Sequence, residues 1–294
     1  MNVTLKQLKV FLSIVHHQNM TLAAQSLYMT KGAISQNLAA LESQLNVRLF
    51  DRINSKLYLS QAGAKLIPLA DELINRAECI DSTFSFSDAL PRIKVGCTKS
   101  IAVFFLPNLL SKFEAELGYL PEIIIDNAYA IEGMLNRYEL DIALLESAVT
   151  DINLSCEYWM TDEMVVVSSS NHPFTQQKSI SYPQLNQSRW ILREPNSASR
   201  RFFENQLAIK LKNPISAFTL NSFDAILLNV YNQLGLTFIS NEVFNHPFYS
   251  EHFTKLNIDD SFFRKFNIVY HKDKFLTQDI VDWIDFIKKS SNSV

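Results

Sequence analysis

The chain of 294 residues is poor in glycine and cysteine: it contains six glycines and three cysteines. So few glycines leave little material for a phosphate-cradling loop, and the sequence contains no P-loop, G-x-S-x-G or H-E-x-x-H motif. Cys79, Cys97 and Cys156 are widely spaced and form no C-x-x-C or Cys/His cluster, so we expect buried, reduced thiols and no zinc site. The six histidines are scattered. These absences argue against an enzyme and against a metal site.

The sequence also lacks an apolar run of about 18 residues, which a membrane-spanning helix needs. The longest candidate is interrupted by Asn229, Asn232 and Gln233. No positively charged segment followed by an apolar one opens the chain. Hydrophobic residues make up 47% and charged residues 19%, an ordinary globular balance, and the length suffices for two or three domains. We therefore expect a soluble, cytoplasmic protein that does not enter a membrane.

The net charge of −3 is unevenly distributed. Residues 1–60 contain six basic and two acidic side chains, a formal charge of +4, so the remainder of the chain carries −7. A basic N-terminal segment on an acidic body is the asymmetry expected when only that segment meets nucleic-acid phosphates. Chance alone can also produce an excess of this size, so the interpretation needs the support of a motif.

Residues 21–50 predict two helices joined by a tight turn. Thr21 can cap the first helix, whose small apolar face allows a second helix to approach closely. Tyr28-Met29 form the turn, and Thr30 can cap the second helix. That helix repeats apolar residues at helical spacing, at Ile34, Leu38, Leu41 and Leu45. Its opposite face carries polar residues near the helix start, where a recognition helix meets base edges: Lys31, Ser35, Gln36 and Asn37.

Both flanks of this helix pair extend the pattern. Upstream, apolar residues at helical spacing predict a third helix, at Leu5, Leu8, Phe11, Leu12 and Val15. Downstream, residues 47–60 alternate around Asn54-Ser55, which predicts a small β-hairpin, or wing. The N-terminal unit over residues 1–60 is therefore predicted to be a winged helix-turn-helix.

This unit closely resembles the winged helix-turn-helix of the LysR-type transcriptional regulators. The shared signature consists of Ala23-Ala24, Leu27, Ala33-Ile34-Ser35, Leu41-Glu42, Leu45, Leu49-Phe50, Arg52, Leu59-Ser60 and Gly63. The expected DNA-contacting residues are Thr21, Thr30, Lys31, Gly32, Ser35, Gln36, Arg52 and Lys56. Two positions depart from the family. Asn46 replaces a glycine, as the next-best residue for a left-handed helix end, and Gly32 replaces a frequent proline and loosens the first helical turn.

Residues 61–90 predict a linker helix followed by a hinge. An apolar stripe marks one side of the helix, at Leu66, Leu69, Leu73, Ile74 and Ile80. A wide stripe next to a small domain usually packs against another helix, and the resemblance implies the same helix of a second chain. Pro68 should kink or break the helix near Lys65, and residues 82–88 should form the hinge. We expect a homodimer or a homotetramer.

From residue 91 onward strands alternate with helices, which indicates βαβ units and a largely parallel sheet. The expected strands are 93–97, 122–126, 141–145, 164–167, 190–192, 215–220, 236–239 and 266–270. The expected helices are 103–117, 131–138, 199–209, 224–233 and 278–289. The resemblance implies a periplasmic-binding-protein-like effector domain, with lobe I at 91–161 and 267–294 and lobe II at 162–266. The fold class is thus multidomain, an α unit followed by a two-lobed α/β unit.

Three of the expected strand-to-helix junctions are rich in small hydrogen-bonding residues: Thr98-Lys99-Ser100, Ser197-Ala198-Ser199 with Arg200, and Asn221-Ser222. Ligands of open α/β sheets bind beyond the carboxyl ends of strands, against helix N-termini, and these residues suit a small anion. Ordinary helix caps have the same composition, so each junction also has a purely structural interpretation. The resemblance favours the first junction, which contains Thr98 and Ser100. Relatives often carry Ser or Thr where this chain has Ala128, and this difference favours a less polar effector. The resemblance adds Asn127, which matches a second pocket position of the family. The candidate effector-binding residues are Thr98, Lys99, Ser100, Asn127, Ser197, Ser199 and Ser222.

Together these features predict a LysR-type transcriptional regulator that is not an enzyme and holds no cofactor. It is expected to bind an interrupted inverted repeat in double-stranded DNA as a symmetric oligomer, and the resemblance adds RNA polymerase as a partner. A small-molecule effector between the lobes is expected to alter the angle between paired heads. Two alternatives stay open: a solute-binding or enzymatic α/β protein with a DNA-binding head, and a ligand-independent DNA-binding protein with a vestigial cleft.

Overall fold

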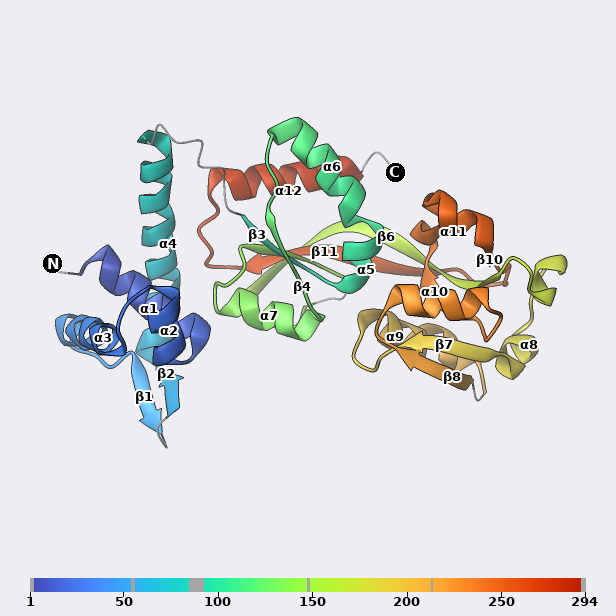
Figure 1. Cartoon of the computed structure of the whole chain (residues 1–294), viewed down its shortest axis with the longest axis horizontal. Helices are drawn as coiled ribbons and strands as arrows, with labels where there is room; N and C mark the ends of the chain where they lie inside the picture. The colour runs from blue at the N-terminus through green and yellow to red at the C-terminus, as the bar shows by residue number, and fades with distance from the viewer. Residues whose placement is uncertain (1–2, 54–55, 85–92, 147–148, 213, 292–294) are drawn as a thin grey trace.

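The computed structural model describes residues 3–53, 56–84, 93–146, 149–212 and 214–291. Figure 1 shows a helical N-terminal head, the long helix α4 beside it, and an α/β body with two lobes. The expected wing tip, Asn54-Ser55, and the part of the expected hinge at 85–88 lie outside the described residues.

Three helices form the head: α1 (Leu5–His17), α2 (Met20–Ser26) and α3 (Lys31–Leu45). The Thr30 hydroxyl caps α3 by accepting a hydrogen bond from the Ala33 N–H, as predicted. The cap of α2 is Asn19, whose Oδ1 accepts from the Thr21 N–H at 2.8 Å, so the prediction that Thr21 caps this helix is wrong. Asparagine is at least as good a cap as threonine, and the chain leaves α1 at Gln18 in a left-handed turn, which places Asn19 first.

The core of the head lies between α1 and α3. Phe11, Ile34 and Leu41 are fully buried in one apolar cluster that both helices supply. Leu5 is 45% exposed, so the predicted stripe of α1 begins only at the second turn. Asn46 ends α3 with φ 52°, which is the left-handed conformation that its replacement of a family glycine predicts.

The wing is an antiparallel pair, β1 (Phe50–Ile53) and β2 (Lys56–Leu59). Its junction with α4 (Gln61–Phe84) requires a glycine. A Cβ on Gly63 would lie 2.4 Å from the Leu49 carbonyl oxygen and 2.6 Å from Leu59 Cδ1. Ser60 caps α4 by accepting from the Gly63 N–H at 3.0 Å. This close approach gives the Ser60-x-x-Gly63 part of the signature its physical reason.

Helix α4 continues through Pro68, so the predicted break does not occur. It also extends to Phe84, so residues 82–84 are helical and do not belong to a hinge. A proline removes one backbone hydrogen bond from a helix interior. Ile67 and Ala70 on either side of Pro68 are buried in the cluster of the head, and this packing stabilises the helix across the proline.

Two long antiparallel strands, β6 (Leu154–Ser169) and β11 (Phe262–His271), run from one lobe into the other (Figure 1). Within the described residues the sheet has the order β10-β6-β11-β5-β3-β4, with β9 paired to β6. In lobe I, β3 (Lys94–Cys97) pairs in parallel with β4 (Glu122–Ile125) and β5 (Ile142–Leu145). The predicted strand at 164–167 is the second half of β6. Its first half was missed because residues 155–163 mix polar and apolar side chains without a steady alternation.

Lobe I covers its sheet with α5 (Lys99–Phe104), α6 (Leu106–Leu117), α7 (Ala128–Asn136) and α12 (Gln278–Ser291). The prediction of one helix over 103–117 is wrong. A separate helix starts directly after Thr98 and ends at Phe104, and α6 then begins with Pro107 in its first turn, where proline is favoured. The lobe packs around Phe113, Phe266 and Trp283, which are fully buried.

Lobe II contains the parallel pair β7 (Arg189–Arg193) and β8 (Ile215–Leu220), with β9 (Thr237–Ser240) and β10 (Phe253–Lys255) on β6. Its helices are α8 (Tyr182–Gln187), α9 (Ala198–Phe202), α10 (Phe223–Tyr231) and α11 (Pro247–His252). Of these elements α8, α11 and β10 were not predicted. The helix expected over 199–209 is α only to Phe202 and continues as a π turn and a 3₁₀ turn. Trp190 and Phe203 fill the lobe interior.

A buried lysine joins α4 to lobe I. Lys274 lies after β11, and its Nζ is 3.0 Å from Asp71 Oδ2 on α4 and 2.8 Å from Asp141 Oδ1. Asp141 Oδ2 also accepts from the Lys94 N–H at 2.7 Å. Burial lowers the pKa of Lys274, but the charges of Asp141 and Asp71 outweigh burial and leave that pKa raised. The lysine is therefore charged and spans the junction between head and body.

Replacing Lys274 by Met should lower the urea midpoint of unfolding strongly, because Asp71 and Asp141 would remain as poorly compensated like charges. Breaking a buried pair costs about 3–5 kcal/mol, whereas an exposed pair contributes about 0–1 kcal/mol. The exposed Lys255–Glu163 pair supplies the matched control, Lys255→Met. Equal midpoints for the two variants would contradict the role assigned to Lys274.

Candidate DNA-binding surface and effector cleft

The start of α3 presents polar side chains to solvent. Lys31, Gly32 and Gln36 are exposed, and Ser35 is half-buried among them. Asn37 donates from Nδ2 to the carbonyl oxygen one turn earlier, at 2.8 Å, and so serves the helix itself. Four of the expected DNA-contacting residues thus share one accessible helix end, as a recognition helix requires.

Tyr28 lies in the turn just before this helix end and was not predicted as a contact. Its backbone is left-handed, with φ 52°, and its side chain is 99% exposed. In the sequence it is only a turn residue, because no apolar stripe includes it. A large aromatic side chain wholly in solvent beside α3 is available for contact with DNA.

The other expected DNA contacts lie on neighbouring elements. Arg52 is on β1 and Lys56 is on β2, so both belong to the wing; their side chains lie outside the described structure. Thr21 is exposed in the first turn of α2, and Thr30 is exposed while its hydroxyl caps α3. The expected surface therefore spans the turn, the start of α3 and the wing.

The apolar stripe of α4 divides into two sets. Leu69, Leu73 and Ile80 are exposed by 58%, 46% and 61%, and Phe84 beyond them by 79%. Ile74 is buried in the cluster of the head, and Leu66 is half-buried against the same cluster. Ile74 therefore serves the core of its own chain, and the accessible stripe is narrower than the sequence predicted.

A cavity of about 100 Å³ lies between the two lobes. Its wall contains six of the seven candidate effector-binding residues: Thr98, Lys99, Ser100, Asn127, Ser197 and Ser199. Ser222 is not in the wall; its Oγ accepts from the Ala225 N–H and caps α10. The wall also contains residues that were not predicted as contacts: Asp126, Ala128, Glu146, Arg193, Glu194 and Ala198.

The predicted wall residues differ in what their side chains already bind. Asn127 caps α7 by accepting from the Ala130 N–H at 3.0 Å, and Ser197 caps α9 by accepting from the Arg200 N–H at 3.2 Å. The Thr98 hydroxyl has no hydrogen-bond partner among the described residues, although Thr98 is only 4% exposed. The cap interpretation therefore holds for Asn127 and Ser197, and Thr98 is left with an unsatisfied hydroxyl.

Hydrogen bonds also connect the lobes across the cavity. Ser100 Oγ of lobe I lies 3.0 Å from Ser199 Oγ of lobe II. Lys99 Nζ donates to the Asn221 carbonyl oxygen at 3.3 Å. Direct contacts thus connect the two lobes beside the cavity.

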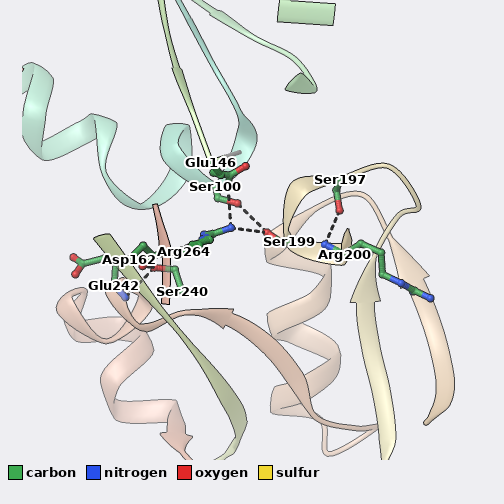
Figure 2. A network of polar contacts seen from close by, with 9 residues as sticks. All are labelled: Ser100, Glu146, Asp162, Ser197, Ser199, Arg200, Ser240, Glu242 and Arg264. Carbon is green, nitrogen blue, oxygen red and sulfur yellow. Dashed lines mark hydrogen bonds and ion pairs between the residues drawn. The ribbon is translucent and has the colours of Figure 1, made fainter. Parts of the chain in front are cut away.

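Figure 2 shows a buried polar network next to these serines, with Arg264 at its centre. Arg264 Nε donates to Asp162 Oδ2 at 2.7 Å, and its Nη1 lies 3.2 Å from Glu146 Oε1 and 3.4 Å from Ser199 Oγ. Ser240 Oγ donates to the other oxygen of Asp162 at 2.6 Å. Burial raises the pKa of Asp162, against the opposing effect of Arg264. No sequence motif indicated this network, because its members come from five separate segments.

The three cysteines lie on α4, β3 and β6. Cys97 is buried, as predicted, but Cys79 and Cys156 are exposed, so the expectation of buried thiols is wrong for these two. Cys79 lies on α4 near its C-terminal end, and Cys156 lies on the half-exposed part of β6. Among the described residues no group of three or more potential metal ligands occurs, and no helix is long and apolar enough to cross a membrane.

Comparison with known proteins agrees with this architecture. Residues 5–64 match the family model of the bacterial regulatory helix-turn-helix protein, lysR family, and residues 88–292 match that of the LysR substrate binding domain. The chain therefore belongs to the LysR family of transcriptional regulators and is not an enzyme.

Among its relatives, the RuBisCO operon transcriptional regulator of Acidithiobacillus ferrooxidans is 30% identical over 246 residues, covering 81% of this chain and 78% of the relative. An uncharacterized HTH-type transcriptional regulator of Escherichia coli, YeiE, is 26% identical over 288 residues, 97% of each chain. Among solved structures, full-length OxyR from Pseudomonas aeruginosa matches with a TM-score of 0.73 at 18% identity, over 99% of this chain and 95% of that one. The whole chain thus has the fold of full-length LysR-type regulators.

The exposed position of Gln36 near the start of α3 predicts a role in reading bases. Gln36→Ala should weaken binding to a site obtained by in-vitro selection by about 1–3 kcal/mol, and binding to random DNA by less. Gln44→Ala, at the exposed C-terminal end of the same helix, is the matched control. Fluorescence anisotropy measures both. An equal loss on selected and random DNA would show that Gln36 does not read sequence.

Proposed function

We propose that this regulator responds to a small molecule bound between its two lobes. The observation that carries the proposal is that six candidate residues line one cavity. They come from the starts of three helices, at positions 98–100, 127 and 197–199. Both lobes supply wall residues, so a ligand there touches Thr98 and Ser100 on one side and Ser197 and Ser199 on the other. Such a ligand binds the closed arrangement of the lobes better than an open one, and this difference is what shifts a conformational equilibrium.

We further infer that the head binds an interrupted inverted repeat in DNA as part of a homodimer or homotetramer. The start of α3 and the wing supply the surface for each half-site, and a two-fold protein matches a two-fold DNA site. RNA polymerase is the expected partner of the DNA-bound oligomer. Effector binding would change the angle between paired heads, since the cavity lies in the body and the head is a separate unit.

One structural relative supports a ligand-responsive body. The regulatory domain of CcmR from Synechocystis, solved in complex with 2-PG, matches with a TM-score of 0.63 at 20% identity, over 69% of this chain and 98% of that one. The wall of the cavity is polar, and the buried Thr98 hydroxyl in it has no hydrogen-bond partner among the described residues. Both features favour a ligand site over the alternative of a ligand-independent protein with a vestigial cleft.

The exposed stripe of α4 should form the main contact between two chains. Leu73→Asp would then place an unpaired charge in an apolar interface, at a cost of several kcal/mol, and the oligomer should dissociate. Leu22→Asp is the matched control, because Leu22 on α2 is exposed to a similar extent, 48% against 46%. Analytical ultracentrifugation distinguishes the outcomes. A Leu73→Asp protein that stays fully oligomeric would exclude α4 as the main contact.

Double substitution Thr98→Val, Ser100→Ala removes two wall hydroxyls with little change in volume. A small polar metabolite that raises the thermal midpoint of the wild-type protein should no longer do so, since a ligand stabilises only the state that binds it. Ser222→Ala removes a hydroxyl of the same kind outside the cavity and should leave the shift unchanged. Differential scanning fluorimetry over a metabolite library provides the measurement. A full shift in the double variant would place the ligand elsewhere.

A further inference from the structure

The cleft proposed as the effector site carries more negative than positive charge. Its wall contains three carboxylates, from Asp126, Glu146 and Glu194, and two cations, from Lys99 and Arg193. Both oxygens of Glu194 accept from the Arg193 guanidinium, at 2.7 and 2.8 Å, so this pair is internally neutral. A simple anion would therefore have to compete with carboxylates that are already in place.

Arg264 beneath the wall does not balance this excess. Its Nε and the Ser240 hydroxyl satisfy the two oxygens of Asp162, so Arg264 and Asp162 form a pair without net formal charge, while Arg264 Nη2 has no hydrogen-bond partner among the described residues. Glu146 is a second carboxylate for the same guanidinium, at 3.2 Å. The formal charges of Arg264, Asp162 and Glu146 sum to −1, and all three residues are less than a tenth exposed. Burying an uncompensated charge costs free energy, and a cation supplied from the cavity would offset that cost.

Glu146 is placed to receive such a cation. It follows β5 directly, lines the cavity, and is 7% exposed. A carboxylate offers about four lone-pair positions, so Glu146 can accept from Arg264 and from a ligand at the same time. The negative charge of Glu146 also affects the nearby thiol of Cys97. Burial raises the pKa of Cys97 to about 12, and the charge of Glu146 adds to that increase.

Thr98 supplies a second, independent indication of a ligand. Its hydroxyl lines the same cavity and has no partner among the described residues. A buried hydroxyl without a partner costs free energy, so a ligand atom that hydrogen-bonds to it gains affinity. The cavity volume of about 100 Å³ is far below the roughly 300–1,000 Å³ of sites for drug-sized ligands, so the ligand has few heavy atoms.

We propose that the effector is a small primary amine that also bears a hydroxyl or carboxylate group, and that Glu146 recognises its ammonium group. The ammonium donates to Glu146, and the hydroxyl or carboxylate pairs with the Thr98 hydroxyl. This inference rests on the proposed function of the cleft and adds the chemical class of the ligand. An amine replaces the small anion expected from the sequence. That expectation considered only the helix-start residues, which supply hydrogen-bond donors, and did not include the carboxylate of Glu146.

Two matched pairs of probes test the ammonium group on the wild-type, full-length protein. Glycine differs from glycolate, and ethanolamine from ethylene glycol, by an ammonium in place of a hydroxyl. Isothermal titration calorimetry should show at least one amine binding on the order of 10- to 100-fold more tightly than its partner, as a charge-assisted hydrogen bond provides. The proposal is overturned when neither amine binds more tightly than its partner, and equally when neither amine binds at all.

Glu146→Gln keeps the shape of the side chain and removes its charge. The variant should bind amine and hydroxyl probes within about threefold of each other. Glu163→Gln, on β6 and paired with Lys255, is the control and should keep the full preference. Because Glu146 contacts Arg264, Glu146→Asp serves as a second variant that retains the charge and should restore part of the preference. A folded Glu146→Gln protein with the wild-type preference would refute the role of Glu146.

The double variant Thr98→Val, Ser100→Ala separates failure of this inference from failure of the proposed function. Amine binding that persists unchanged in the double variant places the ligand outside the cleft, which contradicts both. Glycolate that binds the wild-type protein more tightly than glycine, and is lost in the double variant, keeps the cleft as the effector site but refutes the amine.

Discussion

The pairing of Arg264 with Asp162 is the interaction on which the cleft depends. The two residues lie directly opposite each other on β11 and β6, the strands that both lobes share, and their side chains meet at 2.7 Å. From this point the guanidinium reaches Glu146 in lobe I and Ser199 in lobe II. Separating a buried charge from its partners costs several kcal/mol of free energy. This cost favours the arrangement of the lobes in which Arg264 keeps these contacts.

The junction between head and body uses the same physical device. Lys274 is buried between Asp71 of the linker helix and Asp141 of lobe I. Buried ion pairs contribute little net stability compared with apolar packing, but an arrangement that breaks them is strongly disfavoured. Lys274 follows β11 closely in the chain, so one segment carries the cation at the floor of the cleft and the cation at the head. The short chain segment from Arg264 to Lys274 therefore connects the cleft to the ion pair with the linker helix α4.

The head could be predicted almost completely from the sequence because its structure is set by local signals. Helical spacing of Ile34, Leu38 and Leu41 determines the buried face of α3, and Asn46 ends it in the left-handed turn that its residue type favours. The misplaced cap of α2 shows the limit of such reasoning. Asn19 and Thr21 are both good caps, and only the path of the chain out of α1 decides between them.

In the body the sequence by itself determined the alternation of strands and helices, and with it the junctions that supply Thr98, Ser100 and Ser197. Their chemistry is readable because small hydroxyl residues at the start of a helix are a local pattern. Only the tertiary structure decided which junctions meet, and it left Ser222 outside the cavity. It alone brought Glu146 to the wall, because the buried partner of that carboxylate, Arg264, is distant in the chain. Local patterns cannot encode such a pairing; packing of the long shared strands does.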